Sequence, residues 1–236
     1  MESLKLIEAL SNAYGACGFE DEVVAIAEKY AHDEDLGAVR HDCHLHVYID
    51  AHKNTGKKPV VMVDAHSDEV SFIVQAIKPN GTLHFLPLGG WSNYTVPAHK
   101  VKVQTYDGKW VSGIVASTPV PFLSAAQKHA CPTIADLVID TGAPPKEEVE
   151  KVFNFHIGAP VGPDVTCEYN EETDVMLGKA FDNRVGCAAV LETMKDLKGS
   201  DLDVDVVGVL SSQEEIGERG AFVTRDVVKP DIAICF

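Results

Sequence analysis

The sequence is poor in basic residues. Its 236 residues include 20 Lys and Arg against 36 Asp and Glu, which gives a formal net charge of −16. Binding to nucleic acid or to an anionic membrane surface depends on clustered Lys and Arg, so this composition argues against both kinds of partner. The sequence also lacks an apolar run long enough to span a bilayer, and its first ten residues lack the pattern of a secretory signal.

The cysteines do not form a recognisable disulfide or zinc-binding pattern. No CxxC spacing occurs among the six, which are Cys17, Cys43, Cys131, Cys167, Cys187 and Cys235. In a chain of this length, scattered cysteines are typical of free thiols in a reducing compartment. We therefore expect a cytoplasmic protein, and its 45% of hydrophobic residues is enough for an ordinary packed core.

The apolar pattern changes twice along the chain. Helix-period and strand-like segments alternate in residues 1–69 and again in residues 163–236. Residues 70–162 instead contain short apolar runs separated by Gly, Pro and Asn turns, which predicts a small antiparallel barrel or sandwich. We therefore predict an α/β domain interrupted by a β-rich insert. In the first part, residues 44–49 and 59–64 flank a polar turn and predict a hairpin.

The first motif that could carry chemistry is DAHSDE at residues 64–69, directly after the apolar run 60–63. Ligands of α/β folds bind where strands end, and His66 and Asp68 would point the same way from an extended segment. His66 could bind a metal while a nearby carboxylate holds its other ring N–H. An ordinary polar turn after a strand would also explain these residues.

The second motif is GKAFDNRVG at residues 178–186, where Asp182 stands just before a predicted helix. An Asp at this place is a good helix N-cap. A carboxylate that bridges two cations would occupy a similar place, so the motif alone leaves both interpretations open.

The third motif is QEEIG at residues 213–217, after the buried strand predicted for residues 203–211. Two adjacent carboxylates, Glu214 and Glu215, repel each other, and burying them without cations is costly. Their side chains diverge, so one could bind a metal while the other faces a substrate as a base. An exposed acidic turn is the alternative. Together, the three motifs offer His and carboxylate ligands that suit zinc, cobalt or manganese in a two-metal hydrolase.

These motifs, in this order, resemble the M42 family of metallo-aminopeptidases, some of which were once labelled endoglucanases. GFEDE at residues 18–22, LGGW at 88–91 and RGA at 219–221 extend the resemblance over essentially the whole chain. The resemblance implies a zinc-peptidase-like α/β sandwich with an inserted β-rich, barrel-like dimerisation domain. It also implies homo-oligomers, namely dimers that assemble into large hollow particles such as dodecamers, and peptides as substrates.

The resemblance also assigns roles to individual residues around two divalent metal ions, zinc or cobalt before manganese. His66 is a terminal ligand of one metal, and Asp68 is the carboxylate behind it. Asp182 bridges both metals, and Glu215 is the terminal carboxylate of the other. Glu214 is the general base that activates a metal-bridging water to hydrolyse the N-terminal residue from a peptide.

The sequence departs from the family pattern at its C-terminal end. In relatives, an Asp after the strand that matches residues 231–236 and a later His complete the two metal sites, and this chain ends before both. We therefore expect a C-terminally truncated member of the family. The alternative function is that of a catalytically inactive member or fragment that acts only in assembly or binding. An endoglucanase, which needs two carboxylates around a sugar cleft and no His66, ranks third.

Overall fold

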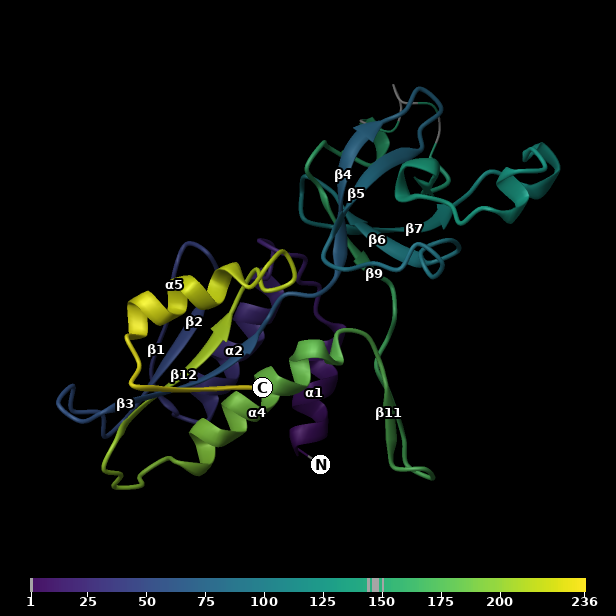
Figure 1. Cartoon of the computed structure of the whole chain (residues 1–236). Helices are drawn as coiled ribbons and strands as arrows, with labels where there is room; N and C mark the ends of the chain where they lie inside the picture. Colours follow the sequence, from purple (N-terminus) through teal and green to yellow (C-terminus); the bar gives the residue numbers. More distant parts are fainter. Residues whose placement is uncertain (1, 144, 146–148, 150) are drawn as a thin grey trace. The chain divides into compact units, whose positions relative to one another are not determined.

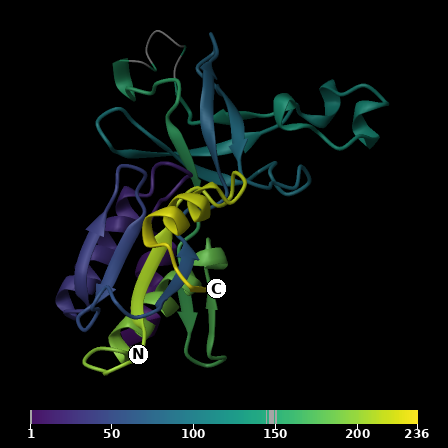
Figure 2. The same cartoon turned by 60° about the vertical axis from the view of Figure 1, so that its left-hand side comes forward.

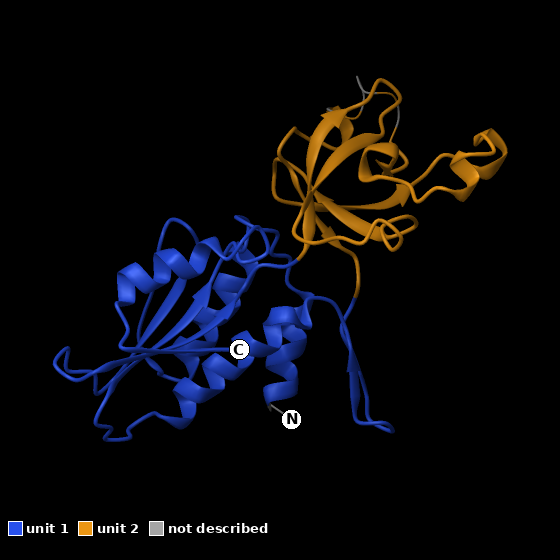
Figure 3. Ribbon diagram, viewed as in Figure 1, with its two compact units in different colours: residues 1–69, 166–236 blue, residues 70–165 orange. Residues whose placement is uncertain are grey.

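The chain folds into two compact units, which Figure 3 shows in different colours. The first unit consists of Met1–Glu69 and Thr166–Phe236, and the second of Val70–Val165. The structure, a computed structural model, describes residues 2–143, 145, 149 and 151–236 (Figure 1). The first unit contains all the residues of the three motifs from which a metal site is predicted.

A five-stranded mixed sheet forms the centre of the first unit. In spatial order its strands are β1 (Gly37–His41), β2 (Val47–Ala51), β12 (Asp205–Ser211), β3 (Val60–His66) and β13 (Ile232–Cys235). β12 runs parallel to β3, and β3 runs parallel to β13, whereas β1, β2 and β12 pair antiparallel. All seven residues of β12 are buried, as expected for a central strand that is covered on both faces.

Four helices cover the two faces of this sheet (Figures 1 and 2). They are α1 (Glu2–Asn12), α2 (Asp21–Asp33), α4 (Phe181–Asp196) and α5 (Arg219–Val228). Val206 and Leu210 of β12 belong to the large core with α1, α2 and α4, whereas Val207 and Val209 belong to a smaller cluster that includes Val228 of α5. Because strand side chains alternate, α5 covers the opposite face from the other three helices.

The predicted hairpin between residues 44–49 and 59–64 is wrong. β12 lies between β2 and β3, antiparallel to β2 and parallel to β3. The polar turn at residues 53–58 was compatible with a hairpin, but β12 is apolar on both faces and takes the centre of the sheet, where both of its edges are paired. This insertion is important for the site, because it brings the end of β12 beside the end of β3.

The second unit is a closed six-stranded antiparallel barrel. Its strands, in order around the barrel, are β4 (Ser71–Ile77), β5 (Leu83–Leu88), β8 (Val138–Asp140), β7 (Trp110–Ala116), β6 (Lys100–Gln104) and β9 (Pro160–Pro163). Trp91 stacks on Phe72 of the barrel core at 4.5 Å and donates its Nε1–H to the Ser71 carbonyl oxygen at 3.0 Å. The predicted fold class, an α/β unit with an inserted β-rich barrel, is confirmed.

Smaller elements complete the description of the two units. A two-stranded hairpin of β10 (Glu168–Asn170) and β11 (Val175–Leu177) extends from the first unit (Figure 1). Within its described residues, the second unit carries three short 3-10 helices, η1 (Val120–Phe122), η2 (Gln127–His129) and η3 (Ile134–Asp136). Among the described helices, none combines the length and the apolar character needed to cross a bilayer.

Candidate metal centre

The parallel pairing of β3 and β12 brings the first and third motifs together. In the register of this pair, His66 at the end of β3 lies opposite Ser211 at the end of β12. Beyond the strands, the Ser67 N–H donates to the Ser211 carbonyl oxygen at 2.7 Å, so the two segments remain side by side. The site therefore lies at the carboxyl ends of two neighbouring parallel strands, where α/β sheets bind ligands.

His66 stands at the centre of a group of carboxylates. Its Nε2 atom lies 3.0 Å from Asp182 Oδ1 and 3.7 Å from Glu214 Oε2. His66, Glu214 and Glu215 each offer one ligand atom, and these atoms all lie within 4.8 Å of one another. The structure thus brings three of the five predicted site residues, Asp182, Glu214 and Glu215, close to the His66 ring, and the fifth, Asp68, lies behind it.

Asp68 is fully buried and joins the segments that follow β3 and β12. Its Oδ1 accepts the backbone N–H of Glu214 at 3.0 Å, and its Oδ2 accepts that of Glu215 at 3.1 Å. Oδ2 also accepts the Cys17 thiol at 2.8 Å, and Oδ1 lies 3.5 Å from His66 Nδ1. Asp68 therefore orients the His66 ring and fixes the backbone of both glutamates.

No sequence pattern indicated the part played by Cys17. It lies 51 residues before Asp68, and no spacing relates it to the other motifs. Burial, followed by the neighbouring charge of Asp68, raises the pKa of its thiol far above the usual range, so the group remains an S–H donor at neutral pH. GFEDE at residues 18–22, which contributed to the family resemblance, was the nearest signal.

Asp182 approaches His66 from the start of α4. Asn183, and not Asp182, acts as the helix cap here, because Asn183 Oδ1 accepts the Gly186 N–H at 3.1 Å. Asp182 itself has an extended ψ of 103°, and its side chain is 89% exposed. Its carboxylate is therefore free of a capping role and points to the His66 ring.

The electrostatics of the group are those of a site with excess negative charge. Burial raises the pKa of Glu215. The charge of His66 lowers it and the charges of the neighbouring carboxylates raise it, so that it stays above its usual range. Burial alone would lower the pKa of His66, but the hydrogen bond and charge of Asp68, with Asp182 and Glu214, raise it to about 9. A protonated ring thus supplies the counter-charge that a divalent cation would provide instead.

The donor set fits a divalent transition metal. Ligand atoms of His66, Glu214 and Glu215, one from each, lie within 4.8 Å of one another, and Asp182 Oδ1 approaches His66 Nε2 at 3.0 Å from a third chain segment. Zinc, cobalt and manganese accept this mixture of ligands. His66 also has the carboxylate behind its second ring nitrogen that metal-bound histidines usually have.

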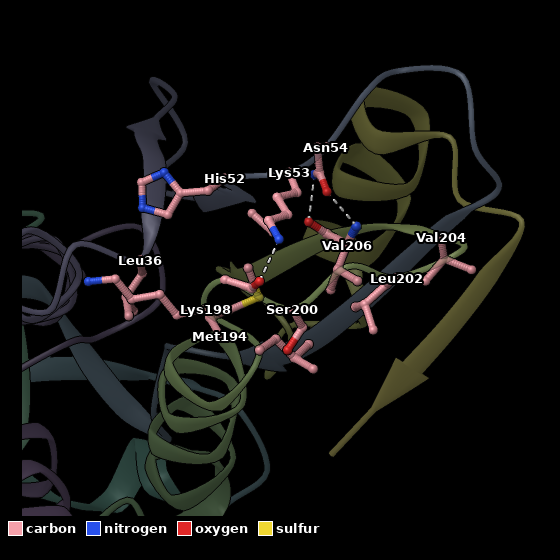
Figure 4. A pocket seen from close by; sticks show the side chains of 13 residues that line it. Leu36, His52, Lys53, Asn54, Met194, Lys198, Ser200, Leu202, Val204 and Val206 are labelled. Carbon is pink, nitrogen blue, oxygen red and sulfur yellow. Dashed lines mark hydrogen bonds between the residues drawn. The ribbon is translucent and has the colours of Figure 1, made fainter.

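A small cavity at the other end of the sheet has none of this chemistry. Its lining includes Leu36, His52, Lys53, Asn54, Met194 and Val206 (Figure 4). Lys53 Nζ donates to the Gly199 carbonyl oxygen at 2.6 Å and Asn54 Nδ2 to that of Val206 at 2.7 Å, so its polar atoms are already used within the protein. The converging ligand atoms at the carboxyl ends of β3 and β12 remain the candidate site.

Comparison with known proteins gives a consistent family. A model of the M42 glutamyl aminopeptidase family matches residues 48–236. The glutamyl aminopeptidase of Lactococcus lactis is 29% identical over 234 residues, which are 98% of this chain and 65% of that protein. Two archaeal structures are also similar.

The first of these is the crystal structure of the TET aminopeptidase from the marine sediment archaeon Thaumarchaeota archaeon SCGC AB-539-E09. It has a TM-score of 0.92 at 34% identity, and the match covers 99% of this chain and 64% of that one. The second is the Pyrococcus horikoshii TET1 peptidase, which can assemble into a tetrahedron or a large octahedral shell. It has a TM-score of 0.84 at 24% identity, over 99% of this chain and 68% of that one. The chain spans about two thirds of the Lactococcus and marine archaeal proteins.

Proposed function

The chain belongs to the M42 glutamyl aminopeptidase family, and on this basis we propose that it carries the central metal-binding and base residues of a two-metal aminopeptidase. The reaction is hydrolysis of the N-terminal residue from a peptide. The observation that carries the proposal is that His66 gathers with Glu214 and Glu215 at the ends of β3 and β12, while Asp182 Oδ1 lies 3.0 Å from His66 Nε2.

Three of these residues would hold the metals. His66 is a terminal ligand of one ion through Nε2, because its other ring nitrogen already faces Asp68. Glu215 would hold the second ion, and Asp182 would be shared between the two. Bound divalent cations would polarise the scissile carbonyl and make the attacking water more acidic. With a metal bound, Asp68 would hold the proton on Nδ1, so that the Nε2 lone pair would face the ion.

Glu214 is the general base in this proposal. Its side chain is partly exposed and lies beside His66, with Oε2 3.7 Å from Nε2, while Asp68 holds its backbone N–H. The carboxylate can therefore face a peptide without leaving the site. It would take a proton from the attacking water and pass it to the nitrogen of the leaving peptide.

The test compares Glu214→Gln with the unchanged residue. Because the chain spans about two thirds of its marine archaeal relative, the assay uses the chain and also the chain extended by the part of that relative which it does not match. Gln keeps the size of Glu and removes its basicity. We expect kcat on unblocked peptides to fall by about 10²–10⁴-fold. Metal content should not change, and the exposed Glu172→Gln should serve as an unaffected control.

Two results would count against this function. Equal turnover by Glu214→Gln would show that another group is the base. Metal binding without any turnover, in both the chain and the extended chain, would favour the second candidate, a family member that acts only in assembly or binding.

We also propose that the chain forms homo-oligomers through its barrel. Val120 and Phe122, on the segment between β7 and β8, expose 64% and 80% of their surfaces. Large apolar side chains exposed close together are typical of an interaction surface.

A further inference from the structure

The first unit contains a cluster of buried charged groups that are sequence neighbours of the candidate metal-site residues. It consists of Glu69, Lys179 and Arg184, whose side chains are 1%, 4% and 0% exposed. Lys179 Nζ lies 2.6 Å from Glu69 Oε1, and Arg184 Nη2 lies 3.8 Å from the same oxygen. None of the three has a role in the predicted metal site.

The cluster connects the N-terminal segment to the first and second metal-site motifs, residues 64–69 and 178–186. Lys179 Nζ also donates to the Ala13 carbonyl oxygen at 2.8 Å, and Arg184 Nη1 donates to that of Leu10 at 2.6 Å. Glu69 Oε1 accepts the Gly15 N–H at 3.1 Å, while the Glu69 N–H donates to the Gly15 carbonyl oxygen at 2.9 Å. Three distant chain segments therefore meet at one ion pair.

The two partners of this ion pair are near neighbours of the metal-site residues in sequence. Glu69 follows Asp68 directly and stands three residues after His66. Lys179 stands three residues before Asp182, and the left-handed Ala180 between them (φ 53°) turns the chain toward the site. The ion pair thus connects the segment that ends β3 to the segment that presents Asp182.

Asp182 needs such support from its backbone. Its side chain is 89% exposed, so packing contributes little to its position, yet its Oδ1 lies 3.0 Å from His66 Nε2. A buried ion pair is weak evidence for stability, because desolvation offsets most of the attraction. Its geometry, however, is restrictive, since both partners must meet inside the protein to compensate each other.

We propose that Glu69 and Lys179 are positioning residues for the metal centre, which hold Asp182 at the distance from His66 that a shared metal ion requires. This inference rests on the proposed role of Asp182 and His66 as ligands. A merely structural role would anchor α1 and contribute to stability without affecting metal affinity. The two roles are separable, because stability and metal affinity are measured independently.

The test uses the single variant Lys179→Met and the double variant Glu69→Gln/Lys179→Met. The single change leaves buried Glu69 with only Arg184, 3.8 Å away, to compensate it, so it can prevent folding. The double change removes both charges of the ion pair and leaves Arg184 bonded to the Leu10 and Ala13 carbonyl oxygens. Asp205→Asn is the matched control. Asp205 is also buried, and its carboxylate accepts the N–H groups of Thr55 and Gly56 at 2.8 and 2.6 Å, at the opposite end of β12.

Zinc and cobalt binding is measured by calorimetry, and the visible spectrum of bound cobalt reports its coordination geometry. We expect the folded double variant to bind either metal about 10–100-fold more weakly, with an altered cobalt spectrum, as for other residues that orient metal ligands. Asp205→Asn should lose stability and keep the metal affinity.

Unchanged affinity and an unchanged cobalt spectrum in the double variant would overturn the inference and leave the metal centre standing. Failure of both variants to fold would also overturn it, because the pair would then be a requirement of the fold. If the unaltered chain bound neither metal, the proposed metal centre itself would be wrong.

Discussion

Replacing Asp68 by Asn should destabilise the first unit selectively. The change keeps the shape of the side chain but removes its charge and turns one acceptor oxygen into an N–H donor. Oδ1 now accepts the Glu214 N–H, and Oδ2 accepts the Glu215 N–H and the Cys17 thiol. Whichever way the amide is oriented, one of the two backbone N–H groups loses its acceptor.

The expected loss follows from these contacts. An unsatisfied buried donor costs about 1–3 kcal/mol, and hydrogen bonds to a charged acceptor contribute about twice as much as neutral ones. The sum of the two effects is about 2–4 kcal/mol in the free energy of unfolding. For a protein of this size, each kcal/mol lowers Tm by about 2–4 °C, so the expected decrease is roughly 4–16 °C.

The two units can be followed separately in one sample. Helices α1, α2, α4 and α5 belong to the first unit, so circular dichroism at 222 nm follows it. The two tryptophans, Trp91 and Trp110, belong to the second, so their fluorescence follows the barrel. Asp68→Asn should lower the Tm followed by circular dichroism and leave the Tm followed by fluorescence unchanged. Asp201→Asn, at an exposed position, should change neither Tm. A loss below about 1 kcal/mol would refute the reasoning, since even one orphaned N–H costs more.

The loss should also depend on pH when a chelator keeps the site free of metal. Burial would raise the pKa of Asp68, but hydrogen bonds from His66, Cys17 and two backbone N–H groups hold it below 3.8. Its contribution is therefore complete above that value and is lost as pH falls through the folded pKa. The raised pKa of His66, about 9 against 6.5, contributes stability below pH 6.5 that is lost as pH rises through 9. The difference between the unchanged protein and the variant should be largest between about pH 4 and 6.5.

Two further predictions concern the metals and the barrel. Asp182→Ala should remove measurable zinc or cobalt binding in calorimetry, because His66 and Glu215 would each be left as a lone ligand, and equal binding by the variant would contradict the bridging role. Residues 70–165 expressed alone should give a strand-type circular dichroism spectrum and sediment as a dimer or larger species, because the barrel is closed and has its own core. A disordered monomer would contradict the second prediction.

Local pattern was sufficient for two strands of the barrel. Short apolar runs occupy residues 100–104 and 110–116 of the sequence, and β6 and β7 have the same bounds. In β6 the core-facing side chains alternate with partly exposed ones, and this period of two is visible in the sequence. Local pattern could not predict the order of strands in the first sheet. The position of β12 between β2 and β3 depends on a pairing with residues about 145 positions away.

The site was predictable in its members but not in its connections. The spacing of His66 and Asp68, and the position of Glu214 and Glu215 after a buried strand, made them candidates, and the family resemblance assigned their roles. The hydrogen bonds that organise them run from Asp68 to backbone groups 146 and 147 residues away and to the Cys17 thiol. A backbone N–H has no residue-type signature, so no motif could reveal these contacts.

The structure also distinguishes between interpretations that the motifs left open. An Asp before a helix is usually a cap, but Asn183 already binds the Gly186 N–H, and Asp182 turns toward His66. Adjacent glutamates after a strand could be a solvated turn, but the backbone N–H groups of Glu214 and Glu215 are held by a buried carboxylate. An acidic turn in solvent needs no such anchor. Glu214 and Glu215 are thus held beside one imidazole by contacts that fix their backbone and leave their oxygens within 4.8 Å of a His66 nitrogen, and Asp182 adds a third carboxylate at 3.0 Å. A divalent cation would neutralise this arrangement.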